Sequence, residues 1–409
     1  MAEASAPATP GPVPSGRGRI GLYSHAPLEY YGGGEVTSIL LANWFASHGW
    51  EVEVWAESAY AGPRRLSPSE LQGLLDPRVR YGTVAFQDRK WAGVPSIWRS
   101  TLPPADHLAR NDASLLLLPT VPDRRYLREL LARGLPAMFL LHALTVDQPF
   151  PWRRRIVRDQ LIHRLSLYGL RGLPASGHLL YEVLNDRSAE LLRGHGVAPG
   201  QVRLIPTGID FDRYEVGSDG GTFRVAFVGR IHEPWKGISR LRRTIDRLRA
   251  SLPGPVEFVL MGSGPDAEEL KRWAERSPSV RYLGFVPFEE KVRELSKSSL
   301  LLSTSGSEPY GLTSLEGFAC GLPLVATPTA GSSYLLRQNA LFGSLASYSP
   351  AALAGHVLPY RVAWSEDPER YAADRSERRR RARALFDLPQ MFARYEECLA
   401  ELTDGRTTA

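Results

Sequence analysis

The sequence predicts an α/β protein of two domains, and its length, composition and pattern of apolar runs support this prediction. The chain has 409 residues, which is enough for two domains of ordinary size, each with its own hydrophobic core. Its composition, 43% hydrophobic and 23% charged, is that of a folded globular protein. Short apolar runs alternate with amphipathic segments, which is the pattern of parallel strands covered by helices.

The clearest element is a strand-loop-helix-strand unit in residues 299–335. Residues 299–304 and 323–327 are short apolar runs and predict two buried parallel strands. Gly311 and Gly321 bracket a helix between them, since glycine is common at helix ends. The apolar residues of this helix recur at helical spacing: Leu312, Leu315, Phe318 and Ala319. The loop before the helix therefore lies at the carboxyl end of a strand, where open α/β sheets bind ligands.

Two acidic residues border this loop. Glu308 lies in it, and Glu316 lies early on the helix that follows. Ionised carboxylates only accept hydrogen bonds, while the N–H groups of a helix N-terminus bind anions, so the combination suits a ligand with both hydroxyl groups and phosphate. A nucleotide sugar has these parts. The alternative is that Glu308 is an ordinary loop acid and Glu316 a solvated helix residue, and two acids at this spacing would not by themselves exclude it.

The residues around the two acids favour the first interpretation. Residues 308–327, EPYGLTSLEGFACGLPLVAT, resemble the donor-site signature of glycosyltransferase family 4, the retaining nucleotide-sugar enzymes of group 1 with the GT-B fold. The resemblance extends over roughly residues 19–402 and implies two Rossmann-like domains that face each other across a deep cleft. It also implies that Glu308 orients the donor sugar and that Glu316 binds the ribose. Further donor-binding residues follow from the same motif: Tyr310, Gly311, Leu312 and Thr313.

The first domain is expected to span residues 19–206, after an Ala/Pro/Gly/Ser-rich segment, residues 1–18, that we expect to be disordered. Strands are predicted at residues 19–24 and 51–56, with a helix between them that ends near Gly49. A glycine loop precedes that helix and lets backbone N–H groups approach an anion: Gly32, Gly33 and Gly34. A triple glycine is more often a turn, but at this place it resembles the family's glycine loop, which faces the donor phosphates.

His142 is the candidate site residue of the first domain. Apolar runs near residues 115–118 and 137–141 predict two further strands, and His142 follows the second. A lone histidine is usually structural, yet one at the carboxyl end of a buried strand points toward the ligand cleft. The resemblance implies that His142 contacts the donor sugar near the reacting carbon and does not act as a nucleophile.

Two arginine-rich stretches of the chain are considered for contact with anions. Residues 152–168 form a basic amphipathic segment, which predicts either a solvated helix face or contact with an anionic membrane or acceptor. Residues 376–383, SERRRRAR, predict a solvated helix end, with phosphate or lipid contact as the alternative. The other basic residues are scattered, so the net charge of +6 gives no indication of nucleic-acid binding.

A linker, residues 207–222, is expected between the domains. Its beginning, PTGID, resembles the family's interdomain motif with Thr207 in place of asparagine. Asp210 and Asp212 have the spacing of a metal-binding D-x-D pair. We reject that interpretation because the linker motif covers both residues and because GT-B enzymes of this type generally need no divalent metal. The sequence therefore predicts no metal and no cofactor.

The second domain is expected to span residues 223–387 and to provide most donor contacts. Its first loop resembles the family's G-R-x-x-x-x-K-G segment, which implies that Arg230 and Lys236 neutralise a diphosphate leaving group. Strands at residues 256–261 and 280–286 end in loops at the same edge. By resemblance, Val286 lies near the nucleobase and Gly262 lets the base pack closely. A final helix, residues 388–402, is expected to return to the first domain and complete it.

These features and the family resemblance together predict a glycosyltransferase that uses a nucleoside-diphosphate sugar, with UDP favoured and GDP next. The resemblance implies that the configuration of the sugar is retained. The acceptor is a hydroxyl group of a glycan, a lipid-linked molecule or a small molecule, and the sequence leaves these open. The alternatives are a GT-B sugar-nucleotide epimerase and a non-catalytic module that binds sugar nucleotides. Two cysteines without metal-binding spacing and no membrane-spanning apolar run predict a cytoplasmic protein, with peripheral contact to an anionic membrane as a further expectation.

Overall fold

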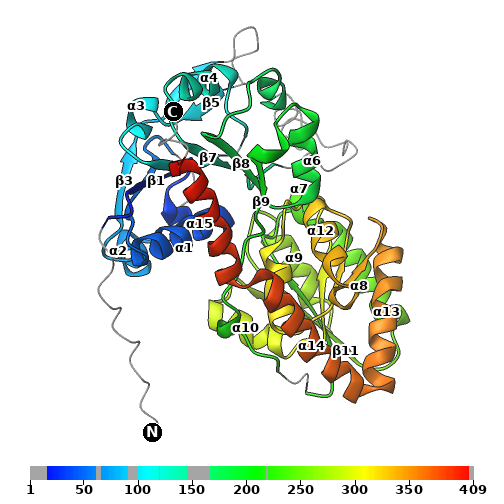
Figure 1. Ribbon diagram of the computed structural model, residues 1–409. Helices are drawn as coiled ribbons and strands as arrows, with labels where there is room; N and C mark the ends of the chain where they lie inside the picture. Colours follow the sequence, from blue (N-terminus) through cyan, green and yellow to red (C-terminus); the bar gives the residue numbers. More distant parts are fainter. Residues whose placement is uncertain are drawn as a thin grey trace.

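The computed structural model describes residues 16–60, 66–90, 99–118, 120–144, 166–217 and 220–404 of the chain. Two α/β units are visible, one formed by the first half of the chain and one by the second half, with a long C-terminal helix running between them (Figure 1). Most of the basic stretch 152–168 and residues 1–15 of the predicted tail lie outside the described residues. Within the described part, no helix is both long enough and apolar enough to cross a bilayer.

The first unit is built on a seven-stranded parallel sheet with the order β3-β2-β1-β6-β7-β8-β9. Its strands are β1 (Arg19–Ser24), β2 (Glu51–Glu57), β3 (Arg80–Val84), β6 (Ala113–Leu117), β7 (Ala137–Leu140), β8 (Leu179–Val183) and β9 (Val202–Leu204). The strands β4 (Gln87–Lys90) and β5 (Arg99–Leu102) form a separate, two-stranded antiparallel sheet. The helices are α1 (Gly33–Ser47), α2 (Pro68–Leu74), α3 (Ala105–Leu108), α4 (Arg124–Ala132) and α6 (Asp186–Gly194).

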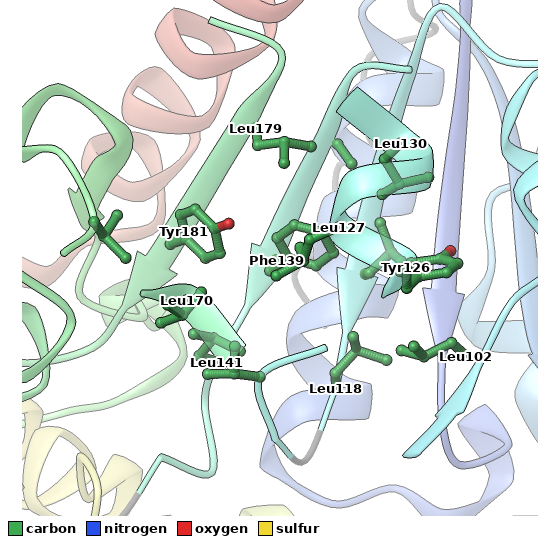
Figure 2. Packing of buried hydrophobic residues seen from close by; sticks show 14 of the residues in the cluster. Leu102, Leu118, Tyr126, Leu127, Leu130, Phe139, Leu141, Leu170, Leu179 and Tyr181 are labelled. Carbon is green, nitrogen blue, oxygen red and sulfur yellow. The ribbon is translucent and has the colours of Figure 1, made fainter. Parts of the chain in front are cut away.

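Alternation along the strands separates two apolar layers in this unit. On one face of the sheet, Phe139, Leu179 and Tyr181 pack with Tyr126 and Leu130 of α4 (Figure 2). The intervening residues of the same strands point to the opposite face, which helix α1 covers. The sheet is therefore buried on both faces, as expected for a parallel sheet.

The second unit has a six-stranded parallel sheet with the order β12-β11-β10-β13-β14-β15. Its strands are β10 (Phe223–Val228), β11 (Val256–Met261), β12 (Val280–Gly284), β13 (Leu300–Ser303), β14 (Leu324–Ala326) and β15 (Gly343–Leu345). The helices are α7 (Glu233–Lys236), α8 (Ile238–Ser251), α9 (Ala267–Glu275), α10 (Phe288–Ser296), α11 (Leu312–Ala319), α12 (Ala330–Gln338), α13 (Pro350–Glu366) and α14 (Pro368–Phe386). The predicted strand-loop-helix-strand unit is β13-α11-β14.

The last helix, α15 (Leu388–Asp404), leaves the second unit and packs on the first sheet. Its buried side chains join the apolar layer that contains α1: Met391, Phe392, Tyr395, Cys398, Leu399 and Leu402. The linker near Ile209 and the chain between α14 and α15 lie side by side. Ile209 N donates to Phe386 O (3.0 Å), and Leu388 N donates to Ile209 O (3.2 Å). The first unit is therefore completed by residues from the far end of the sequence.

The prediction that residues 376–383 form a solvated helix end is wrong for two of the arginines in this segment. The segment lies inside α14, and the carbonyls at the C-terminal end of α11 face it. Arg378 is buried and donates to Gly321 O (2.6 Å), while Arg379 donates to Ala319 O. Helix C-terminal carbonyls lack intrahelical partners and favour positive charge. These arginines thus hold the end of α11, and neither is free for phosphate or lipid.

The aspartates of the D-x-D sequence are used structurally in the linker. The Asp210 carboxylate accepts from the Asp212 N–H group (3.0 Å), which starts a single helical turn, Phe211–Arg213. Asp212 pairs with Arg383 of α14 through two hydrogen bonds of 2.7 and 2.8 Å. The Arg383 guanidinium lowers the pKa of the Asp212 carboxyl. The two carboxylates therefore have different partners.

Candidate active site

The loop after β13 brings a lysine and an acid together. Glu308 lies in that loop, and its Oε2 forms an ion pair with Nζ of Lys236, the last residue of the single-turn helix α7. Both side chains are largely buried, at 17% exposure for Lys236 and 18% for Glu308. Two residues predicted separately, from two different motifs, are therefore in direct contact.

The position of Lys236 depends on the backbone that follows it. Gly237 has φ +64°, and a Cβ atom at this residue would overlap with the carbonyl oxygen of Thr304. The Thr304 hydroxyl in turn donates to Lys236 O (2.8 Å). Only glycine allows the two loops to approach this closely. The glycine of the K-G motif therefore fixes Lys236 beside the end of β13.

The N-terminus of α11 lies beside Glu308 of this ion pair, since a Cβ atom at Gly311 would lie 3.5 Å from Glu308 Cγ. Gly311 has φ +102° and precedes the helix, which starts at Leu312. Leu312 and Thr313 are partly exposed and belong to the first turn, whose N–H groups have no intrahelical partner. These N–H groups and the helix dipole make the position suitable for an anion such as phosphate.

Glu316, one turn further on α11, pairs with a second lysine. Its Oε1 lies 2.5 Å from Nζ of Lys291 on α10, and the Tyr214 hydroxyl donates to the same oxygen (3.3 Å). Glu316 Oε2 is buried and accepts no hydrogen bond from the described residues. Burial raises the pKa of Tyr214, so its hydroxyl remains a donor. Each predicted acid thus has its own lysine, and one oxygen of Glu316 is left for a ligand hydroxyl.

The glycine loop of the first unit meets the beginning of α11. Gly32 is the N-cap of α1, and its N–H group donates to the Glu35 carboxylate (3.1 Å). A Cβ atom at Gly33 would lie 3.3 Å from Leu312 Cδ1, and one at Gly34 would lie 2.8 Å from Leu117 Cδ2. The Gly33 position thus faces the second unit, whereas Gly34 faces the first sheet.

We expect Gly33→Val to lower turnover while nucleotide affinity stays nearly unchanged, because the γ-methyl groups would press on Leu312 while the second unit keeps its own contacts. Gly33→Ala adds one methyl group at 3.3 Å and should be tolerated better. Turnover and nucleotide titration measure the two effects. Gly73→Val is the matched control, since a Cβ atom there meets nothing within 4 Å. Loss of nucleotide affinity in folded Gly33→Val would contradict the expectation.

His142 lies two residues beyond the end of β7, as predicted, and contacts a buried acid. Its Nε2 lies 3.0 Å from Oε2 of Glu182 on β8, which is paired with β7 in the sheet. The His142 side chain is 10% exposed and that of Glu182 is fully buried. Burial raises the pKa of the Glu182 carboxyl, an effect that the nearby His142 opposes.

Four other predicted site residues lie in the second unit, in loops that follow its strands. Arg230 is exposed after β10 and forms no ion pair with another described residue. Gly262 has φ +138°, and a Cβ atom there would overlap with the carbonyl oxygen of Gly229. Val286 is partly buried in the loop after β12, so the strand predicted at 280–286 is shorter than expected. Tyr310 is buried, and its hydroxyl donates to Thr207 O (2.9 Å) in the linker.

Three residues near the predicted site were missed by sequence reasoning: Glu182, Lys291 and Tyr214. Lys291 and Tyr214 are distant in sequence from Glu316, and no local pattern marks them as its partners. Glu182 did leave a signal, because it interrupts the apolar run LLYEVL with an acid. An acid inside a buried strand is rare without a partner, and such a residue invites a search for one.

A surface hollow of about 750 Å³ lies elsewhere on the molecule. Its lining includes Arg19 and Glu51, the first residues of β1 and β2, and Trp50, which precedes β2. In an open parallel sheet, ligands bind beyond the carboxyl ends of the strands, which is the opposite edge. We therefore assign the candidate site to the Glu308 and Glu316 region and not to this hollow.

Comparison with solved structures defines the class of fold as GT-B. The Anabaena protein HepE, solved in complex with UDP and glucose, superposes with a TM-score of 0.65 and 18% identity, over 93% of this chain and 99% of that one. A sucrose-phosphate synthase from Thermosynechococcus elongatus gives a TM-score of 0.68 with 17% identity, over 95% and 100%. The predicted GT-B fold, with its two Rossmann-like units, is confirmed.

Sequence comparison then finds a family match in the second unit. Residues 222–359 match the family described as "Glycosyl transferases group 1", which confirms the predicted resemblance. A D-inositol 3-phosphate glycosyltransferase of Corynebacterium jeikeium is 30% identical over 207 residues, 45% of this chain and 46% of that protein. A phosphatidyl-myo-inositol mannosyltransferase of Propionibacterium freudenreichii is 35% identical over 103 residues, 25% of each chain. The chain spans about half the length of the curated inositol-phosphate enzymes it matches.

Proposed function

We propose that this protein is a retaining glycosyltransferase that moves a sugar from a nucleoside-diphosphate donor to a hydroxyl group of an acceptor. The observation that carries the proposal is the Lys236–Glu308 ion pair beside the N-terminus of α11, with the glycine loop of the first unit against Leu312. Cationic and N–H groups for a diphosphate and a carboxylate for sugar hydroxyls meet there. UDP is the favoured nucleotide and GDP the next, and UDP is bound in the HepE structures.

In the proposed reaction, the bond between the anomeric carbon and the diphosphate oxygen breaks, and its electron pair leaves with the diphosphate. The acceptor oxygen bonds to the same carbon from the same face, and its proton passes to the departing phosphate oxygen. Lys236, Arg230 and the first turn of α11 stabilise the charge that develops on that oxygen. Glu308 and His142 position the sugar, and Glu316 binds the ribose. No protein nucleophile takes part.

The acceptor class is open to direct test. Two of the relatives act, by name, on D-inositol 3-phosphate and phosphatidyl-myo-inositol, so a polyol phosphate is the first acceptor to examine. A thermal-shift screen of UDP- and GDP-sugars identifies the donor, because a ligand at 100 times its Kd adds about 2.7 kcal/mol to the free energy of unfolding. Mass and NMR analysis of the products then separates transfer from epimerisation. Binding without turnover of any donor would contradict the proposal.

We further propose that the reaction needs no divalent metal, because Lys236, Arg230 and the α11 N-terminus supply positive charge at the diphosphate. Asp210 and Asp212 of the D-x-D sequence have other partners in the linker region. Turnover is therefore expected to persist after extensive treatment with EDTA and passage through a metal-chelating resin. Complete loss of turnover that Mn²⁺ or Mg²⁺ restores would overturn this part of the proposal.

A further inference from the structure

Glu182 is a buried acid that the proposed reaction does not yet use. Its side chain has no exposed surface, and neither of its oxygens accepts a hydrogen bond of good geometry from a described residue. Residues two apart in a strand point to the same face of the sheet, so Glu182 shares a face with Leu180 of β8. Leu180 packs in the apolar layer that contains α1 and α15, and Glu182 therefore faces this layer too. A carboxylate in such a place is costly without a compensating charge or a proton.

His142 is the group that can provide this compensation. Its Nε2 is buried and lies 3.0 Å from Glu182 Oε2, which is close enough for the two groups to share a proton. The ring is partly exposed, whereas the acid is not. Because Nε2 is directed at Glu182, Nδ1 is the remaining polar atom with which the ring can meet a ligand.

The other ionisable groups around Glu182 do not change charge between acid and mildly alkaline pH. Tyr310 approaches from the second unit, and Tyr395 and Cys398 approach from α15. Burial raises the pKa of both tyrosines well above the ordinary range and that of Cys398 to about 12. Arg394 is exposed on α15, and Arg203 pairs with Glu401. Among these described groups, His142 is therefore the one placed to exchange a proton with Glu182, at 3.0 Å.

The number of protons bound by His142 and Glu182 together determines the net charge of this buried pair. A carboxylate with a neutral imidazole leaves one uncompensated negative charge in the interior. The net charge is zero if one more proton is bound, either as imidazolium with carboxylate or as neutral imidazole with carboxylic acid. In the first form both ring nitrogens carry hydrogen. In the second, the acid donates to Nε2 and the hydrogen of the ring is on Nδ1. Both net-neutral forms therefore have an Nδ1–H group.

We propose that Glu182 is a positioning residue that forms a proton-sharing pair with His142 and fixes it as an Nδ1–H donor to an oxygen of the bound sugar donor. The inference rests on the proposed function for the identity of the ligand, but the state of the pair is independent of it. His142 remains the residue that touches the substrate, and Glu182 acts through it. Glu182 thereby makes the hydrogen-bonding character of His142 dependent on pH.

Thermal unfolding tests the pair without any substrate. Because the pKa of Glu182 is raised, the fold favours its protonated form, and the pair's contribution to stability is lost as pH rises above the ordinary glutamate range. Glu182→Gln has no charge to bury, so its Tm relative to wild type should increase as pH is raised from below the ordinary glutamate range to mildly alkaline values. In the control Glu53→Gln, which loses an ion pair with Arg80, Tm should be lower at every pH. A Tm difference for Glu182→Gln that is flat or falls with pH would overturn the proposal.

Nitrogen NMR of histidine-labelled protein reports the position of the hydrogen directly. We expect His142 Nδ1 to be protonated at neutral pH in the wild type and in Glu182→Asp, and to show mixed tautomers in Glu182→Gln. An unprotonated Nδ1 in the wild type would contradict the pair. This result stands even if no donor is turned over, so it is separate from the proposed function.

Kinetics show whether the pair matters for transfer. In Glu182→Gln, kcat at neutral pH should fall about 10- to 100-fold, as for the loss of one charge-assisted hydrogen bond, and its decline at high pH should begin at lower pH than in wild type. Glu182→Asp should recover part of the activity and the wild-type shape of the profile. Donor KM should change little. A uniform loss of kcat with an unchanged pH profile would assign Glu182 a merely structural role.

Discussion

Lys236→Met is expected to lower kcat by about 10²- to 10³-fold, the effect of removing one group that stabilises charge in a transition state. Lys236 is largely buried and paired with Glu308, so the structure holds its ammonium group in place before the donor binds. Methionine keeps the length of the side chain and removes the charge. The main loss should therefore be in the rate, measured under saturating donor and acceptor.

Two variants make this result specific. Lys271→Met changes an exposed lysine on α9 and should leave kcat close to the wild-type value. Lys291→Met removes the partner of Glu316 and should act mainly on nucleotide affinity. A Lys236→Met enzyme with kcat within about threefold of the wild type would show that the lysine does not stabilise the leaving group.

Glu316→Ala should weaken binding of the free nucleoside diphosphate and of the donor alike, by about 10- to 100-fold, because a ribose contact is common to both ligands. Glu316 has one oxygen bound by Lys291 and Tyr214 and one buried oxygen without a partner. The second oxygen is the one we expect the ribose to use. Isothermal titration with nucleotide and donor measures both affinities.

Glu308→Ala is expected to behave differently, since Glu308 contacts the sugar in the proposed complex. Removing it frees Lys236 for the diphosphate, so nucleotide affinity should not fall, whereas turnover should drop. Circular dichroism and Tm confirm that both variants are folded. Equal weakening of nucleotide binding by Glu308→Ala and Glu316→Ala would contradict the separate roles of the two acids.

The sequence predicted those parts of the site that depend on local pattern. Apolar runs locate the ends of parallel strands, and glycines such as Gly237 and Gly311 occur where the backbone needs positive φ. Glu308 and Lys236 could therefore be assigned to loops at one edge of a sheet. Their direct contact could not be predicted, because the two residues are 72 positions apart in the sequence and meet only when their loops fold together.

Predictions from charge were less reliable for the same reason. The arginines of residues 376–383 form a local cluster, which is typical of a solvated helix. Whether Arg378 is buried depends on the carbonyl groups of another element, the end of α11, and these are not visible in the local sequence. Glu182 is the opposite case, since a single acid in an apolar strand indicates a partner without identifying it.

The return of α15 to the first unit has a consequence for synthesis of the chain on the ribosome. The first sheet emerges without the helix that covers part of its apolar face, because that helix begins at Leu388. Residues 223–386 must be translated first, which takes on the order of 10 to 30 s at ~5–20 residues per second. During this interval, the part of the sheet around β6 that α15 contacts lacks its native cover, and a nascent chain in this state exposes apolar surface to which chaperones bind. Native packing of the first unit is thus completed only after the second unit has been synthesised, although the first sheet is synthesised earlier.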